Sequence, residues 1–143
     1  KIQEKIKVVF PVHPRTRKKI RLFNLNQKIK DMKNLTIIKP LGYLDFLCLM
    51  ANSKFVLTDS GGIQEETTVL GIPCITLRKS TERPVTAEQG TNMLISTDKN
   101  RIVEACNKMM SGVNIRGKIP KLWDGKAAAR IVNILLKNIK YKK

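Results

Sequence analysis

The residues best suited to chemistry form a short turn, Ser60-Gly61-Gly62, between an apolar run and a stretch with helical character. Glycine has no Cβ, so backbone amides at this turn can come close to a ligand. The first amides of a helix lack partners within the helix and lie at the positive end of its dipole. The turn is therefore a candidate anion site, most naturally for phosphate, where Ser60 either caps the helix or bonds the anion.

Two carboxylates, Glu65 and Glu66, follow this turn within the expected helix. An ionised carboxylate only accepts hydrogen bonds, so it suits hydroxyl groups and repels phosphate. We therefore predict that Glu66 binds the diol of a ribose whose phosphates lie at the turn. The alternative is that Ser-Gly-Gly is only a structural connection, because short motifs of this kind are weak signals by themselves.

Two further candidates follow other apolar runs. His13 comes after the apolar residues 8–12, and Arg83 comes shortly after the apolar residues 73–77. A guanidinium can pair with two phosphate oxygens at once, so Arg83 is a candidate phosphate ligand, with a surface salt bridge as the alternative. His13 is a candidate ligand residue or a structural histidine.

The elements that position these residues alternate along the chain. Apolar stretches predict strands, and periodic stretches predict helices, at residues 7–12 (strand), 14–23 (helix), 34–40 (strand), 43–53 (helix), 55–58 (strand), 60–70 (helix), 73–77 (strand), 84–90 (helix), 93–95 (strand), and helices from 98 and from 124. Such alternation predicts an α/β fold, with a parallel sheet covered by helices on both faces. Right-handed crossovers would bring His13, Leu41, Ser60 and Arg83 to one sheet edge. The last two helices carry apolar stripes and are predicted to pack against the rest of the domain.

The string around the glycine turn, residues 58–66, resembles the SDSGGxQEE signature of the non-hydrolysing UDP-N-acetylglucosamine 2-epimerases. Other segments are similar to family segments, namely residues 40–46 (PLxYLxF), 81–84 (TERP), 90–92 (GTN) and 124–131 (DGxAxxRI). The resemblance runs through nearly all 143 residues, which form one domain, but only through the family's C-terminal domain. It implies a Rossmann-like domain, one half of a two-domain GT-B-type architecture whose N-terminal domain is absent here.

The resemblance also implies site residues. The residues expected to bind UDP are Leu41, Phe46, Ser60, Gly61, Gly62, Glu66 and Arg83. Leu41, through its backbone, and Phe46 would line the uracil pocket. His13 matches a histidine that helps bacterial members bind a second, regulatory substrate molecule.

The activity implied by the resemblance is interconversion of UDP-N-acetylglucosamine and UDP-N-acetylmannosamine, by loss of the C2 proton, expulsion of UDP and its re-addition. The family's catalytic carboxylates lie in the N-terminal domain, so we expect no catalytic residue in this chain. No metal or nicotinamide cofactor is implied. The expected partners are UDP, UDP-N-acetyl-hexosamines, the missing domain and, for the full-length enzyme, a second copy in a homodimer.

The chain is strongly basic, with 28 Lys and Arg against 11 Asp and Glu, a formal charge of +17. Such a charge favours anionic partners, but aromatic residues are only 5% and no nucleic-acid motif occurs, so we expect the cations to be mostly solvated. No apolar run approaches the roughly 20 residues of a membrane span, and no membrane partner is expected. Three widely spaced cysteines, Cys48, Cys74 and Cys106, predict buried reduced thiols in a cytoplasmic protein.

Two other functions stay open at this level. A sugar-nucleotide-dependent glycosyltransferase of GT-B type would share the nucleotide site, but not the two family tags at residues 64–66 and 81–84 together. A basic nucleic-acid-binding module would account for the charge, and its binding would fall steeply with salt.

Overall fold

The computed structural model describes residues 1–113, 115 and 117–139 of the chain. Its elements are, in order, β1 (Val8–Pro11), α1 (Pro14–Leu22), α2 (Asn26–Lys30), β2 (Leu35–Ile38), α3 (Tyr43–Ala51), β3 (Val56–Thr58), α4 (Gly61–Leu70), β4 (Cys74–Thr76), α5 (Pro84–Glu88), β5 (Asn92–Leu94), α6 (Lys99–Met110) and α7 (Ala127–Asn138). Strands and helices alternate as predicted, except that the sequence analysis did not predict α2.

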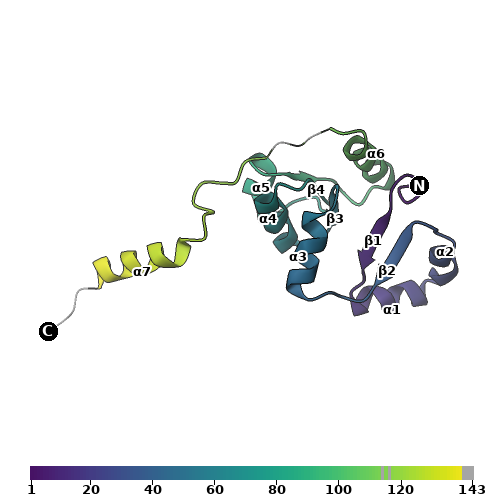
Figure 1. Ribbon diagram of the computed structural model, residues 1–143, viewed down its shortest axis with the longest axis horizontal. Coiled ribbons are helices and arrows are strands. Elements are labelled where there is room, and N and C mark those ends of the chain that lie inside the picture. Colours follow the sequence, from purple (N-terminus) through teal and green to yellow (C-terminus); the bar gives the residue numbers. More distant parts are fainter. Residues whose placement is uncertain (114, 116, 140–143) are drawn as a thin grey trace.

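Every strand pairing in the described part of the chain is parallel, which confirms the α/β class. The strands form two ladders, β1-β2 and β3-β4-β5 (Figure 1). The alternation had predicted one sheet, and that expectation is corrected here: hydrogen bonds join strands within each ladder and not, among the described residues, across them. In β1, Val9 and Phe10 are 36% and 41% exposed.

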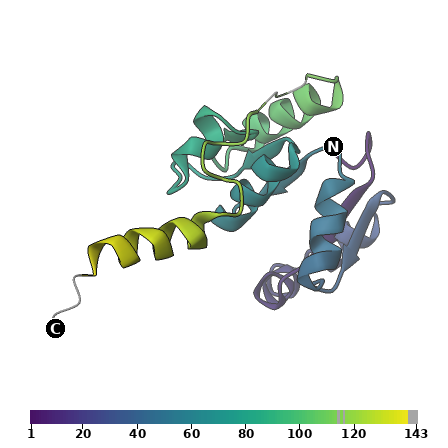
Figure 2. The same ribbon diagram turned by 60° about the vertical axis from the view of Figure 1, so that its left-hand side comes forward.

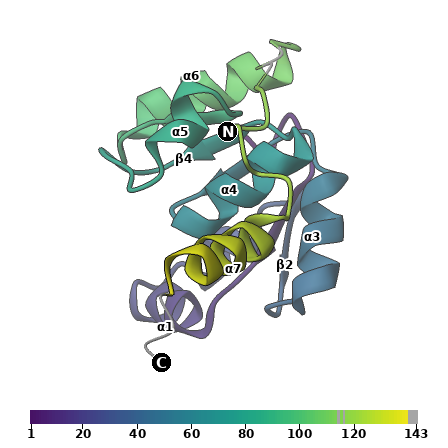
Figure 3. The same ribbon diagram turned by 90° about the vertical axis from the view of Figure 1, so that its left-hand side faces the viewer.

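Helices cover both faces of the β3-β4-β5 sheet, as predicted. Side chains alternate across a strand, so Ile75 in β4 points into one face while its neighbours Cys74 and Thr76 point into the other. Ile75 joins a hydrophobic cluster with residues of α6, namely Ala105, Cys106 and Met109. On the opposite face α4 packs against β4 and β5, and α3 and α5 flank α4 (Figure 3).

This packing buries two of the three cysteines. Cys74 and Cys106 are buried, and burial raises the pKa of both thiols. Cys48 is exposed, so the prediction that all three are buried is wrong. The reason is the rotation of α3, which buries Met50. Two positions along a helix correspond to about 200° of rotation, which turns Cys48 away from the core.

The C-terminal helix α7 leaves the body of the domain (Figures 1 and 2). Its apolar residues are all more than half exposed: Ile131, Val132, Ile134, Leu135, Leu136 and, just after the helix, Ile139. The predicted apolar character is right, but the prediction that this helix packs on the domain is wrong, because none of the α7 residues is buried. Residues 117–120 before it still contact the domain, since the Lys118 amide donates to the Gln89 carbonyl at 2.7 Å and Pro120 is buried, so α7 departs only after them. Among the described helices none is long and apolar enough to cross a membrane.

Candidate functional site

The corner between β3 and α4 has the geometry that the sequence predicts. Ser60 is the N-cap of α4, with φ −85° and ψ 135°, and its side chain makes no capping hydrogen bond. Its backbone amide donates to Thr58 Oγ1 at 3.1 Å. The Ser60 hydroxyl is exposed and the amides at the helix N-terminus are available to a ligand.

The two glycines of the corner have different surroundings. A Cβ on Gly61 would lie 2.5 Å from Glu82 Oε1, so glycine is what allows this carboxylate to approach the first turn of α4. A Cβ on Gly62 would meet nothing within 4 Å. Packing therefore accounts for Gly61, while Gly62 leaves open space beside the helix N-terminus.

The loop after β4 brings two arginines to this corner. Arg78 Nη1 donates to both carboxylate oxygens of Glu82, at 3.1 and 2.8 Å. Arg83 Nε lies 2.9 Å from Glu65 Oε1, an ion pair that joins the loop to α4. A hydrogen bond with its own backbone, followed by the bond from Arg78, lowers the pKa of Glu82. An anionic side chain is thus held ionised beside the helix N-terminus.

The two carboxylates of α4 differ in their partners. Glu65 pairs with Arg83, whereas no ion pair or hydrogen bond links the Glu66 side chain to another residue in the described part of the chain. Successive helix residues point about 100° apart, so the two side chains leave the helix in different directions. The arrangement leaves the Glu66 carboxylate available to a ligand, and its role in ribose binding stays a prediction.

Beneath this surface lies a buried polar cluster that the sequence analysis missed. Gln64 is fully buried and Asn92 is 5% exposed. Asn92 Nδ2 donates to Gln64 Oε1 at 3.0 Å, which links α4 to β5 across the sheet. Thr81 Oγ1 donates to the same oxygen at 2.7 Å. The one sequence signal was that Gln64 and Asn92 both stand inside segments similar to the family.

The remaining predicted residues lie at other strand ends. His13 and Leu41 follow the carboxyl ends of the paired strands β1 and β2, and Phe46 is half-buried in α3. His13 is the N-cap of α1, where its Nδ1 accepts from the Arg15 amide at 3.2 Å. Direct contacts thus join Arg83 to Glu65, and Glu82 approaches Gly61. Among the described residues no hydrogen bond or ion pair links His13, Leu41 or Phe46 to that group, and their ligand roles stay predictions.

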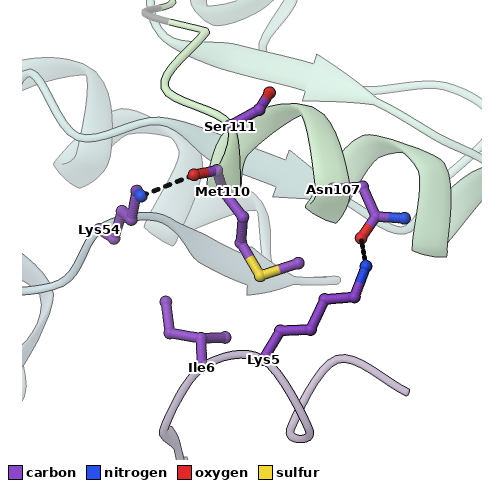
Figure 4. A pocket seen from close by; sticks show the side chains of 6 residues that line it. All are labelled: Lys5, Ile6, Lys54, Asn107, Met110 and Ser111. Atoms are coloured by element: carbon purple, nitrogen blue, oxygen red, sulfur yellow. Dashed lines mark hydrogen bonds between the residues drawn. The ribbon is translucent and has the colours of Figure 1, made fainter.

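A cavity of about 450 Å³ lies at the other end of the strands from the glycine corner, near the start of β3 and the end of α6 (Figure 4). Lys54 Nζ donates to the Met110 carbonyl at 2.8 Å, and Lys5 Nζ donates to Asn107 Oδ1 at 3.0 Å. Both lysines therefore attach their segments to the end of α6. The cavity lies away from the glycine corner, and its lining side chains do not form a recognisable catalytic arrangement.

The described side chains contain no cluster of three or more His, Cys, Asp or Glu that could hold a metal ion. The corner offers a helix N-terminus, the exposed Ser60 hydroxyl, two arginines that are each paired with a carboxylate, and the Glu66 carboxylate, which has no partner among the described residues. Parallel ladders, covering helices and a glycine-rich strand-to-helix corner define the class: a Rossmann-like α/β domain.

Comparison with known proteins identifies the family. The family model described as UDP-N-acetylglucosamine 2-epimerase matches residues 1–136. The chain is 45% identical over 128 residues to the UDP-N-acetylglucosamine 2-epimerase of Methanocaldococcus jannaschii, covering 90% of this chain and 34% of that protein. It is 38% identical over 139 residues to the Escherichia coli K12 protein of the same name, covering 93% of this chain and 36% of that protein. The chain belongs to the UDP-N-acetylglucosamine 2-epimerase family.

Solved structures agree with this assignment. The crystal structure of the Methanocaldococcus jannaschii UDP-GlcNAc 2-epimerase in complex with UDP-GlcNAc and UDP matches with a TM-score of 0.78 and 46% identity, over 90% of this chain and 35% of that one. The Neisseria meningitidis enzyme bound to UDP-GlcNAc matches with a TM-score of 0.76 and 33% identity, over 91% of this chain and 35% of that one. The chain therefore spans about a third of the length of its relatives, and its fold is that of one part of a GT-B-type enzyme.

Proposed function

We propose that this chain is the UDP-holding domain of a UDP-N-acetylglucosamine 2-epimerase, which interconverts UDP-N-acetylglucosamine and UDP-N-acetylmannosamine. The observation that carries the proposal is the β3–α4 corner, where the Ser60 side chain makes no capping hydrogen bond and Arg83, the N-cap of α5, is held against α4 by its ion pair with Glu65. Complexes of two relatives with UDP-GlcNAc, one of them also with UDP, support the choice of ligand.

Each part of the nucleotide has a proposed partner in the chain. The diphosphate lies at the α4 N-terminus, bound by backbone amides, the Ser60 hydroxyl and Arg83. Glu66 accepts hydrogen bonds from the ribose hydroxyls. Phe46 and the backbone at Leu41 hold the uracil, and His13 contributes to a regulatory substrate site between the domains.

The chemical role of these groups is to stabilise UDP as a leaving group. As the bond from the sugar to UDP breaks, negative charge grows on the diphosphate, and fixed donors aimed at that charge lower the barrier. Keeping UDP bound between elimination and re-addition makes its return effectively intramolecular. Proton removal and return at C2 belong to the domain outside this chain.

Two assays test the proposal together. Calorimetry of the chain with UDP is expected to show binding, and Ser60→Ala and Arg83→Gln are each expected to weaken it. Proton exchange at C2 of UDP-N-acetylglucosamine in heavy water is expected to be absent with the chain alone. Exchange by the chain alone would place the chemistry in this domain and refute the division of roles.

The full-length enzyme is further proposed to be a cytoplasmic homodimer, which light scattering of that protein would test. No specific observation favours the glycosyltransferase, and the family match disfavours it. The nucleic-acid module rests on charge alone. DNA binding that falls steeply with salt, together with no UDP binding, would favour that module over the proposed function.

A further inference from the structure

The buried amides of Gln64 and Asn92 belong to the polar side chains of the core that the proposed function leaves unused. Burying an amide without partners costs free energy, so buried amides are almost always paired. Both donors of Asn92 are used: Nδ2 reaches Gln64 Oε1 at 3.0 Å and Thr86 Oγ1 at 3.1 Å. Its Oδ1 accepts from Thr76 Oγ1 at 2.6 Å. The cluster is well satisfied and joins α4, β4, α5 and β5.

A single acceptor fixes the direction of every bond in this cluster. The Ser60 carbonyl can only accept, so the Gln64 atom 3.3 Å from it must be the donor Nε2. Gln64 Oε1 then faces Asn92 and Thr81 and must be the acceptor for both. Neither amide can be turned over without placing two donors or two acceptors together.

The cluster ends on the backbone of Arg83. Thr81 donates its proton to Gln64, so its oxygen is free to accept from the Arg83 amide at 2.9 Å. Thr86 accepts from Asn92 and donates to the Arg83 carbonyl at 2.7 Å. Both polar groups of the Arg83 backbone are therefore held by hydroxyls whose directions the buried amides set.

We propose that Gln64 and Asn92 are positioning residues for the diphosphate site. Through Thr81, Thr86 and the Ser60 carbonyl they hold the Arg83 loop and the start of α4 as one rigid unit. Apolar residues of similar shape would fill the same space at little cost, but they could not hold backbone groups at the ends of two loops. The inference rests on the proposed function and deepens it: these residues act on the phosphate side of UDP and not on the uridine side.

Thr81 is the best place to test this, because it is half-buried in a loop and carries two of the bonds. Thr81→Val removes the hydroxyl at nearly constant shape, and Thr81→Ser restores it. Thr36→Val is the matched control, because Thr36 is exposed on β2 and takes no part in the cluster. Calorimetry or NMR titration of the chain would measure affinity for UDP and for uridine, and hydrogen exchange would report on the Arg83 amide.

The expected result for Thr81→Val is about a tenfold loss of UDP affinity, as for a lost contact of about 1.4 kcal/mol. Uridine affinity is expected to be unchanged and Arg83 amide exchange faster. Thr81→Ser and Thr36→Val are expected to resemble the wild type in all three measurements. If the valine variant melts early, Thr81→Ala takes its place in the same comparison.

Three outcomes would overturn the inference. Equal losses for UDP and uridine would mean general destabilisation of the domain. Unchanged UDP affinity with faster Arg83 exchange would mean that the cluster is structural only. A wild-type chain that binds uridine but gains nothing from the diphosphate would refute the proposed phosphate site itself, and this is recognisable before any variant is made.

Discussion

Glu66→Gln is the sharpest test of the proposed ribose contact, because its neighbour provides a matched control. In α4, Glu65 is engaged by Arg83 at 2.9 Å, while the carboxylate of Glu66 has no partner among the described residues. Glu66 follows Ser60 by six positions, which places its Cα about 9 Å further along the helix axis. Its side chain leans back toward the N-terminus, which shortens the distance to a ribose next to the diphosphate.

The magnitude follows from the type of bond that is lost. Hydrogen bonds to a charged group are worth roughly 1.5–3 kcal/mol, so Glu66→Gln is expected to weaken UDP binding by about 10-fold to 100-fold. UDP lacking its 2′ and 3′ hydroxyls is expected to lose much less. Because α4 begins at Gly61, Glu66 is beyond the first turn, where the helix-dipole effect acts. The melting temperature of the free chain is therefore expected to stay the same.

The assay is calorimetry of Glu66→Gln and of the control Glu65→Gln with UDP and with its 2′,3′-dideoxy analogue. Glu65→Gln frees Arg83 without touching the proposed ribose contact, so it is expected to change the affinity for both nucleotides equally. If Glu66→Gln also affects both nucleotides equally, or affects neither, Glu66 does not bind the ribose and the reasoning fails.

Four further outcomes are expected. Phe46→Ala should weaken UDP by roughly 1–3 kcal/mol with the domain still folded by circular dichroism; unfolding without a separate effect on affinity would make Phe46 a core residue. Gly61→Ala should lower UDP affinity more than Gly62→Ala. A Cβ at position 61 would lie 2.5 Å from Glu82 Oε1 and so would displace that carboxylate, whereas a Cβ at position 62 would meet nothing within 4 Å; calorimetry with UDP compares the two variants. Deleting residues 127–139 should leave the melting temperature unchanged, because α7 contributes no buried side chain; a lower melting temperature would show that α7 packs on the domain. Because the pKa of Glu82 is lowered in the folded state, the ionised carboxylate stabilises the fold above the ordinary value of 4.5, and this stabilisation is lost as pH falls through the lowered pKa. Thermal melts at decreasing pH should therefore show a smaller loss of stability for Glu82→Gln than for the wild type.

Local signals in the sequence were sufficient for the β3–α4 corner. An apolar run, a serine and two glycines predict a strand, a turn and a helix start, and α4 indeed begins at Gly61 and ends before Gly71, which has φ +70°. A helix was likewise predicted to start at residue 98, and Asp98 caps α6 by accepting from the Arg101 amide at 2.9 Å. Such features depend on residues that are neighbours in the chain.

Features that depend on distant residues were missed. A glutamine in a helix is usually exposed, and the hydrogen bond that Gln64 accepts from Asn92 joins residues that are 28 positions apart. Arg83 was expected to bind phosphate, with a surface salt bridge as the alternative; it forms a salt bridge with Glu65 of α4, a partner that the sequence did not indicate, and its phosphate role stays a prediction. The stripe on α7 indicates that one face is apolar, but not whether the same domain covers it.

The net positive charge of the chain does not by itself explain how the proposed site would bind a diphosphate. The formal charge is +17, yet the two arginines at the corner, Arg78 and Arg83, are each already engaged by a carboxylate. A guanidinium has several N–H donors. The Glu65 pair uses the Nε of Arg83 and its Nη1 donates to the Glu82 carbonyl at 3.4 Å, so Nη2 is the guanidinium nitrogen with no partner among the described residues. Attraction between exposed charges is screened beyond about 10 Å in ordinary salt. Under the proposed function, selectivity for a diphosphate would therefore come from the geometry of the α4 N-terminus and Arg83, and the surplus of surface lysine would add only non-specific attraction.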